Sequence, residues 1–530
     1  MTHNWLVLLP PFIVLLSAMI TRHLNLSLAV GIVAAALIST DFSLVDASLK
    51  IIERIFATVT DLENLQMYSF LFMISILIVL LNRTGGAAAF AQKITQRLQS
   101  RRSAESSSLL LSLTLFIDDY LSCLTVGYVM RPIFDTMRIP RAKLAYLVHG
   151  MTGPLVILAP ISSWVAAITA TLDQAGVSSN IKSGTVFVAD PYFMYIQSIP
   201  YIFYSFLTIA SAWFIVRKGI SFGSMHEHEK IAQETGNLFG AKQPITDQMN
   251  AETVPQGTLS DLLIPLITLI ASVFLGTLWT GNYYLFGGTN SLLDAFRTNT
   301  QIFLVLFSAG LISLIVSFIL AFARKRISIT QVPGIVWQGI DLMWSAVLMV
   351  ALASTLSKML RLDLHTGEYL AVLLQGVISL TLLPCIFFIT SSITSILIGS
   401  SWGTMMIFIP IALPMITQLA QIATPADPAS IAILFPVLGA IFSGAVSGDH
   451  LSPISATTIM AATSSGAYTF DHFKTQLPYG IPALFFSALA FLLTGIFVHQ
   501  HMLLKIILPT AVGIFGCCLT LWLLNYTKKR

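Results

Sequence analysis

Acidic and imidazole side chains occur in this sequence within stretches that are otherwise apolar enough for a membrane. Asp118 and Asp119 lie in "FIDDYLSCLTVG", and Asp449 and His450 lie in "SGAVSGDHLSPISATTIM". A charge in the hydrocarbon core costs roughly 3 kcal/mol or more, so such groups usually have a function. Carboxylates can attract a cation or exchange a proton, and histidine titrates near neutral pH. The structural alternatives are an ion pair of Asp119 with Arg131, and a capping or hinge role for Asp449 and His450.

Hydroxyl groups cluster with helix-breaking residues at four places in the chain. Besides the two stretches above, these are "VHGMTGPLVILAPISSW" and "TSSITSILIGSSWGT". Non-helical backbone at membrane depth is tolerated where it is buried in protein or lines a water-filled cavity. Freed carbonyls and hydroxyls suit a weakly held Na⁺, whereas helix N-termini suit a carboxylate. A single Ser or Thr can equally bond its own backbone or a neighbouring helix.

Two sets of candidate residues follow from these clusters. The cation, proton or substrate site is predicted among Asp118, Asp119, Ser122, Thr125, His149, Ser162, Ser163, Ser400, Ser401, Thr404, Asp449, His450, Ser452, Ser455 and Thr457. The helix breaks or hinges are predicted at Gly127, Gly153, Pro154, Pro160, Gly399, Gly403, Gly448 and Pro453. Trp164 and Trp402 occupy matching places in the two halves of the chain and could line the site or merely pack.

The composition indicates what kind of elements hold these residues. Of the 530 residues, 55% are hydrophobic and only 10% are charged, against about 25% in a soluble protein. Apolar runs of about 20 residues recur, each long enough to cross a bilayer. The sequence therefore predicts an all-α polytopic membrane protein with about 11 spanning helices. The four cysteines show no CxxC pair or metal-ligand spacing, so neither a disulfide framework nor a zinc site is indicated.

The lysine and arginine residues predict the topology of the chain. Basic loops at 83–105 and 131–143 flank the apolar segment 106–130, and cytoplasmic loops are the ones enriched in Lys and Arg. Both loops can be cytoplasmic only if the segment enters the membrane and returns as a hairpin. The same reasoning makes 368–412 a hairpin from the other side. Most of the 28 Lys and Arg residues then lie in the cytoplasm, as does the C-terminus.

Two similar units of opposite orientation result, an arrangement typical of secondary transporters. The expected organisation is an N-terminal helix pair (1–60), a first repeat (61–216) with a hairpin near 106–130 and a broken helix at 144–170, a mobile polar cytoplasmic linker (217–259), connecting helices (260–326), a second repeat (327–500) with a hairpin near 368–412 and a broken helix at 429–460, and a C-terminal helix (501–530).

The polar stretches also carry a family resemblance. "FIDDYLSCLTVGYVMRPIFDTMRIPRAKLAYLVHGMTGP", "APISSW", "GSSWGTMMIFIPIALP" and "SGAVSGDHLSPISATTIM" are similar to the NhaC-type Na⁺/H⁺ antiporter family, within a likeness over roughly residues 5–500. The resemblance implies two inverted repeats, cation-coupled elevator-like exchange and a homodimer. The expected function is a Na⁺/H⁺ antiporter with no cofactor, in which Na⁺ is the substrate or coupling ion. The lack of long soluble domains and targeting segments in this sequence suits a bacterial inner membrane.

The sequence departs from the family pattern at the expected site. It reads "DDYLSC" where the family usually reads "DDYANT", His149 stands where the family often has Asp, and Ala456 replaces the acid of "PISDTT". A less negative site suits an anionic or zwitterionic substrate better. The alternative is therefore a Na⁺- or H⁺-coupled carrier of an organic acid or amino acid on the same fold. A channel, which conducts without exchange, and a membrane enzyme, for which no recognisable catalytic set is present, fit the paired breaks less well.

Overall fold

The computed structural model describes residues 5–86, 89, 93, 100–181, 184–244, 257–297 and 301–527, and these are almost entirely helical. Within this part of the chain, nine helices are long and apolar enough to cross a membrane. The number is ten if the bent pair Pro191–Tyr201 and Phe203–Thr235 counts as one span, against about 11 predicted. The predicted all-α polytopic membrane fold is confirmed.

The N-terminal region contains the predicted helix pair and one further helix. Its elements are a 3₁₀ turn (Trp5–Leu8), α1 (Leu9–Thr21), α2 (Leu24–Ser39) and α3 (Leu44–Val59). Helix α3 was not predicted because its polar residues interrupt the apolar run. Arg54 and Lys50 of α3 form ion pairs with Asp363, at 2.5 and 3.5 Å.

The first half of the chain contains the predicted hairpin and broken helix. Its elements are α4 (Leu62–Arg83), α6 (Arg101–Thr114), α7 (Asp119–Thr136), α8 (Arg141–Val156), α9 (Ser163–Gln174), the parallel strands β1 (Val177–Ser178) and β2 (Phe187–Val188), α10 (Pro191–Ser198) and α11 (Phe203–Lys218). Helices α6 and α7 pack together as the hairpin, which extends beyond the predicted 106–130. Helices α8 and α9 are the two parts of the broken helix. The single helix expected at 192–216 is instead bent by 49° near Pro200, which has no N–H to continue the helix.

The segment predicted to be a mobile linker contains a packed helix. Within 217–259, residues Gly223–Thr235 form α12, and part of this helix is buried; residues 245–256 lie outside the described part of the chain. The connecting helices follow as α13 (Leu259–Thr280), α14 (Leu292–Arg297) and α15 (Ile302–Ala323).

The second half contains the other predicted hairpin and broken helix, with different boundaries. Its elements are α16 (Val332–Lys358), α17 (Thr366–Leu374), α18 (Leu383–Ile398), α19 (Ser401–Leu419), α20 (Leu434–Leu451), α21 (Ala456–Ser465), α22 (Thr469–Ile496) and α23 (Leu508–Thr527). The hairpin is α18 and α19, so it begins at Leu383 rather than 368, and α17 is a separate short helix. The broken helix is α20 and α21, at 434–465 rather than 429–460.

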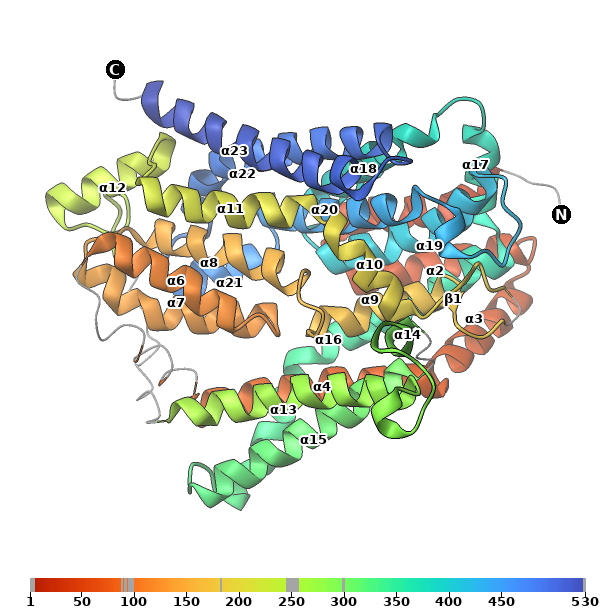
Figure 1. Cartoon of the computed structure of the whole chain (residues 1–530), viewed down its shortest axis with the longest axis horizontal. Helices are drawn as coiled ribbons and strands as arrows, with labels where there is room; N and C mark the ends of the chain where they lie inside the picture. Colours follow the sequence, from red (N-terminus) through yellow and green to blue (C-terminus); the bar gives the residue numbers. More distant parts are fainter. Residues whose placement is uncertain are drawn as a thin grey trace.

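The two hairpins approach each other from opposite ends of the molecule. Figure 1 shows α6, α7, α8 and α21 in the left half, and α9, α10, α17 and α19 in the right half. Helix α12, the end of α15 and the end of α23 also lie at the left. The described parts of several segments predicted to be cytoplasmic, at α12 and at the ends of α15 and α23, are thus grouped at one end.

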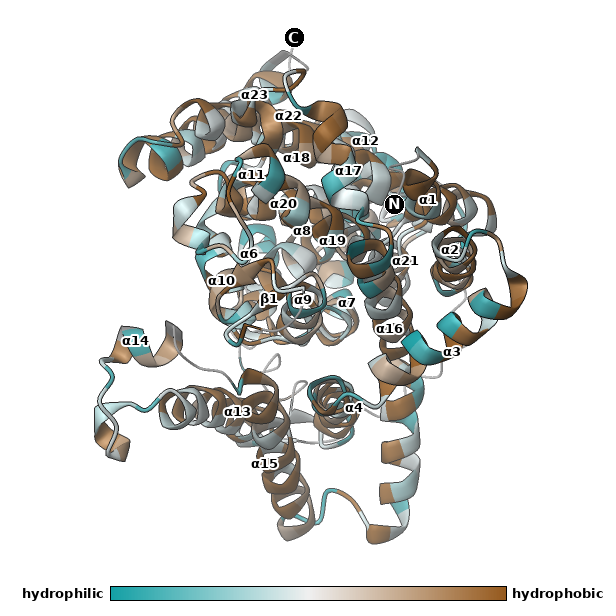
Figure 2. Cartoon of the chain, turned by 90° about the vertical axis from the view of Figure 1, so that its right-hand side faces the viewer, coloured by the Kyte–Doolittle hydropathy of each residue, from teal (hydrophilic) through white to brown (hydrophobic). Residues whose placement is uncertain are grey.

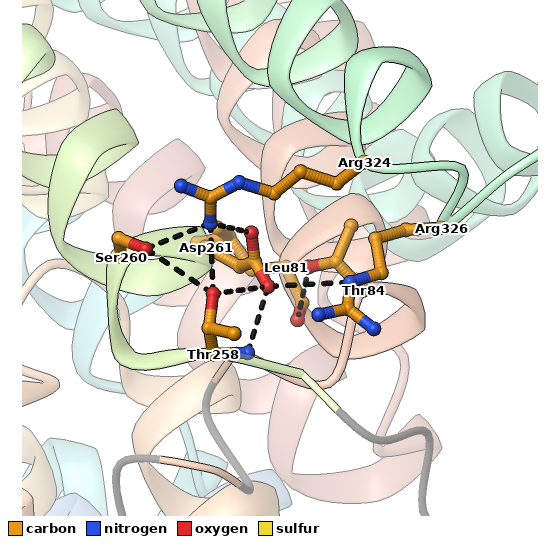
Figure 3. Close-up of polar contacts among 7 residues, drawn as sticks. All are labelled: Leu81, Thr84, Thr258, Ser260, Asp261, Arg324 and Arg326. Atoms are coloured by element: carbon orange, nitrogen blue, oxygen red, sulfur yellow. Dashed lines mark hydrogen bonds and ion pairs between the residues drawn. The ribbon is translucent and has the colours of Figure 1, made fainter.

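Three apolar helices form a body beside this core. Helix α15 packs on both α4 and α13, and Figure 2 shows these three helices set apart from the helices above, to which α16 joins them. At one end of this body, Asp261 of α13 accepts a hydrogen bond from the Thr258 backbone at 2.7 Å and pairs with Arg324 and Arg326 (Figure 3). These contacts hold the start of α13 to the segment that follows α15.

Candidate functional site

A cavity lies where the tips of the two hairpins meet the second broken helix. The cavity has a volume of about 60 Å³, measured as the space open to the centre of a water molecule. One water needs about 10–15 Å³ on the same measure, so the cavity can hold several. Its lining consists of Asp118, Asp119, Tyr120, Met343, Ala346, Met349, Gly399, Ser400, Ser401, Trp402, Asp449, Ala456 and Thr457. Three hydrophobic residues of α16 close one side of the cavity. The polar groups come from the starts of α7, α19 and α21 and from the end of α20.

Several helix ends meet at this cavity because each polar break starts a new helix. Asp118 caps α7 by accepting a hydrogen bond from the Leu121 backbone at 2.9 Å, and Ser400 caps α19 through the Gly403 backbone at 3.2 Å. Ser455 caps α21 through the Thr458 backbone at 3.3 Å. The second carboxylate oxygen of Asp118 is buried and has no partner. It is therefore available to a ligand.

The structure brings together only part of the predicted site. Asp118, Asp119, Gly399, Ser400, Ser401, Asp449 and Thr457 line the cavity. The other predicted ligands are buried nearby or behind it: Ser122, Thr125, His149, Ser162, Ser163, Thr404, His450, Ser452 and Ser455. Some of these have plain structural bonds, as the alternative predicted. Ser162 bonds the Val156 carbonyl at 3.1 Å, Thr404 the Ser400 carbonyl at 2.9 Å and Ser452 the Ile396 carbonyl at 2.8 Å.

A chain of side-chain hydrogen bonds leads from the cavity into the protein. Thr457 donates to Asp449 at 2.9 Å, His149 Nε2 lies 3.0 Å from the Thr457 hydroxyl, and His149 Nδ1 lies 3.1 Å from His472 Nε2. Gln476 also bonds His149 Nδ1, at 3.1 Å. His472 and Gln476 come from α22 and were missed by the sequence reasoning, since α22 has no break to mark them.

The two tryptophans expected at matching places are in contact but belong to different kinds of element. The rings of Trp164 and Trp402 pack edge to face with centroids 6.2 Å apart. Trp164 lies at the start of α9, in the first broken helix, whereas Trp402 lies at the start of α19, in the second hairpin. The contact therefore joins α9 to the tip of the second hairpin and forms part of the wall.

Two of the predicted hinge glycines have clear spatial reasons. Gly399 has φ +71°, a conformation that suits glycine, where α18 ends and the tip begins. A Cβ on Gly448 would lie 2.3 Å from the Ser395 Cβ and 2.5 Å from the Ser392 carbonyl oxygen. Helix α20 can therefore pack this closely on α18 only with glycine there.

Replacing Gly448 by alanine should destabilise the protein by about 1–3 kcal/mol, because the added methyl group forces α20 away from α18. The measurement is the thermal unfolding midpoint of purified protein in detergent. Gly153→Ala is the matched control, because a Cβ there would have no heavy atom closer than 3.8 Å. Equal midpoints for both variants would contradict the close-packing argument.

The chemistry of the cavity is that of a weak cation site. Its described lining contains three carboxylates and three hydroxyl-bearing residues besides Tyr120, and no Lys or Arg. Among the described residues, no group of three or more His, Cys, Asp or Glu is arranged to hold a metal ion tightly. The carboxylates and hydroxyls of the cavity can thus attract a monovalent cation or hold a proton.

Comparison with known sequences gives a family match and one extended relative. The model of the family described as "Na+/H+ antiporter family" matches residues 155–496. A Haemophilus influenzae protein described as uncharacterized is 30% identical over 494 residues, which cover 92% of this chain and 90% of the relative. The malate-2H⁺/Na⁺-lactate antiporter of Bacillus subtilis is 35% identical over 117 residues, 21% of this chain and 22% of that protein.

Solved structures share the fold at low identity. The YdaH transporter of Alcanivorax borkumensis aligns with a TM-score of 0.52 at 14% identity, covering 86% of this chain and 89% of that one. MtrF of Neisseria gonorrhoeae aligns with a TM-score of 0.52 at 15% identity, covering 86% of each chain. Because the sequence identities are this low, the two structures support the fold of this chain and not its function.

Proposed function

The chain belongs to the Na⁺/H⁺ antiporter family, and we propose that its own reaction is the exchange of Na⁺ for H⁺ through the cavity between the hairpin tips. It is a multi-pass membrane protein and a secondary transporter, not an enzyme. The proposal extends to the site residues, to a bacterial inner membrane with the C-terminus in the cytoplasm, and to a homodimer.

The observation that supports Na⁺/H⁺ exchange is the charge of the cavity lining. Asp118, Asp119 and Asp449 face a space whose described lining has no basic residue. A carboxylate at membrane depth is costly unless it binds a cation or a proton. Na⁺ and H⁺ therefore compete for the same groups, and a site that can bind only one of them at a time exchanges the two. Ser400, Ser401 and Thr457 supply the neutral oxygens that complete a Na⁺ site.

The arrangement of helices supports alternating access by movement of one body against another. The hairpins and broken helices surround the cavity, and α4, α13 and α15 form a separate apolar body (Figure 2). We propose that the two units are inverted repeats and that the body with the cavity moves against the other, as in an elevator.

The test uses purified protein in liposomes that carry an internal pH dye. With a pH gradient imposed, addition of Na⁺ or Li⁺ should move protons, whereas K⁺ should not. Saturation with the ion concentration would distinguish exchange from a channel. A folded protein with no response to any of these ions would refute the proposal.

A second candidate keeps the fold and changes the cargo. The relative from Bacillus subtilis is named for malate and lactate as well as Na⁺. Helices α7, α19 and α21 also begin at the cavity, and helix N-termini favour anions. Against this candidate, an organic acid would meet three carboxylates, and His149 lies behind the lining instead of in it. Stimulation of proton movement by malate, lactate or an amino acid, without any response to Na⁺ alone, would favour it.

Replacing Ala456 by aspartate should lower the half-saturating Na⁺ concentration at least about tenfold. Ala456 lines the cavity as the first residue of α21, where a carboxylate also suits the helix dipole. A charge about 4 Å from the ion contributes up to about 4 kcal/mol at an effective dielectric constant of about 20, reduced by desolvation. Ala456→Asn controls for size. Equal Na⁺ dependence in both variants would contradict a cation site here.

A further inference from the structure

We infer that His472, His149 and Thr457 form a proton relay between the cytoplasmic side of the protein and Asp449 in the cavity. This inference rests on the proposed Na⁺/H⁺ exchange and adds the route by which the proton reaches the shared carboxylate. It depends on three consecutive hydrogen bonds of 2.9 to 3.1 Å. They join residues from α20, α21, α8 and α22.

The donors and acceptors of the chain all point in one direction. An ionised Asp449 can only accept, so the Thr457 hydroxyl donates to it and its oxygen accepts from His149 Nε2–H. A neutral His149 then has a bare Nδ1, which accepts from the Gln476 amide and from His472 Nε2–H. A neutral His472 is left with a bare Nδ1, and this buried atom has no hydrogen-bond partner. The free acceptor lies at the end of the chain away from the cavity.

This polarity allows a balanced proton transfer. A proton that arrives at His472 Nδ1 releases the Nε2 proton to His149 Nδ1. His149 then releases its Nε2 proton to the Thr457 oxygen, and Thr457 passes its hydroxyl proton to Asp449 Oδ2. His472, His149 and Thr457 each gain one N–H or O–H bond and lose another, and the net result is a neutral Asp449. When Na⁺ enters from the cytoplasm, the reverse sequence returns the proton of Asp449 to His472. Net exchange then requires that the next proton reaches Asp449 from the opposite side of the membrane.

The outer end of the chain lies close to the proposed cytoplasmic surface. His472 is the fourth residue of α22, and its neighbour Asp471 pairs at 2.6 Å with Lys242, whose side chain is half exposed. Asp471 also lines a small pocket with His228 of α12 and Arg141 of α8. His472 itself is fully buried, and these charged and titratable groups lie next to it at the start of α22.

Three nearby groups face the relay without belonging to it. The Ser455 hydroxyl lies 2.7 Å from the Thr457 hydroxyl and donates to it when Thr457 donates to Asp449. The ring of His450 of α20 packs edge to face with that of His149, at 4.8 Å, and its Nδ1 bonds the Tyr204 hydroxyl of α11 at 2.7 Å. Gln476 holds His149 from the side and also donates to the His450 carbonyl. These contacts keep His149 in one orientation. The relay is therefore preorganised for transfer toward Asp449. Each transfer leaves both imidazoles with the proton on the other nitrogen, and the reverse transfer restores the starting tautomers.

The test compares two fluxes in liposomes for wild type, His472→Gln and His472→Ala. Glutamine places an amide donor near Nε2 and so keeps the bond to His149, but it cannot take up a proton on one nitrogen and release one from the other. Na⁺-driven proton movement should fall at least about tenfold in both variants. Exchange of ²²Na⁺ for Na⁺, which needs no proton, should stay within about twofold of wild type in the Gln variant. His226→Gln on the exposed face of α12 is the control for loss of a histidine.

The two fluxes distinguish a failure of the relay from a failure of the proposed function. If the wild-type protein exchanges Na⁺ for H⁺ and His472→Gln moves protons at the same rate, the relay is overturned and the antiporter proposal stays intact. Equal loss of both fluxes in the Gln variant would assign His472 a structural role and also overturn the relay. No Na⁺-driven proton movement in wild type would overturn the relay together with the proposed function.

Discussion

Asp449→Asn should reduce both Na⁺-driven proton movement and Na⁺/Na⁺ exchange by at least about a hundredfold. Asp449 lines the cavity, accepts the bond from Thr457 and is buried, so its charge is not screened by water. An ion about 4 Å away gains about 4 kcal/mol at an effective dielectric constant of about 20, and each 1.4 kcal/mol is a factor of ten. Asparagine keeps the size and a hydrogen-bond acceptor but can hold neither the charge nor the exchangeable proton. Both fluxes should be measured in the same liposomes.

The pattern of loss separates Asp449 from the relay. The variant of the shared carboxylate should lose both fluxes, whereas His472→Gln should lose only the proton flux. Glu53→Gln, which neutralises an exposed acid on α3, should change neither. If Asp449→Asn retained Na⁺/Na⁺ exchange at the wild-type rate, Na⁺ would bind without this carboxylate, and Asp118 and Asp119 would be left as its only acidic ligands in the described lining.

The helical architecture was predictable because the bilayer restricts what a chain can do. Apolar runs must be helices, and basic loops on both sides of 106–130 require that segment to return. The element boundaries were less predictable. Pro200 bends a helix that appeared continuous, and α17 is apolar enough to merge with the hairpin that follows it. Neither the bend at Pro200 nor the end of α17 interrupts the apolar run of the sequence, and the boundaries were predicted from those apolar runs.

The site was predictable only where a break in an apolar run marked it. Asp118, Ser400 and Asp449 stand at such breaks and line the cavity. Ser162 also stands at a break, but its hydroxyl donates a hydrogen bond to the Val156 carbonyl and does not line the cavity, because a buried hydroxyl can bond to nearby backbone. His472 lies in a regular helix, and only packing of α22 against α8 brings it to His149. Contacts between residues more than 300 positions apart leave no signal in one sequence.

The polar segment after α11 shows a similar limit of sequence reasoning. Its composition suggested a mobile linker, yet α12 and the residues that follow it are fastened to the core. Arg141 of α8 lies over the ring of Phe239, at 5.3 Å, and Lys242 pairs with Asp471. Glu229 of α12 pairs with Lys143 of α8. The described part of the segment, up to residue 244, is therefore attached to the core on the side of the molecule where the relay ends.

Lys143→Met should destabilise the protein by about 3–5 kcal/mol, because it leaves two carboxylates buried without a partner. Lys143 lies 2.9 Å from Glu105 of α6 and 2.5 Å from Glu229, and all three side chains are at most 11% exposed. The ion cluster thus joins the first hairpin, the broken helix and α12. The expected observation is a large fall in the thermal unfolding midpoint in detergent, with earlier proteolysis of α12.

A triple variant distinguishes the buried charge from the loss of the lysine side chain itself. Lys143→Met combined with Glu105→Gln and Glu229→Gln removes the uncompensated charges and should recover most of the lost stability. Lys230→Met on α12 is the control, since Lys230 and Glu234 are 64% and 60% exposed and such pairs contribute about 0–1 kcal/mol. If the triple variant were as unstable as Lys143→Met, the destabilisation would come from lost packing, and α12 would be held to the core by shape instead of charge.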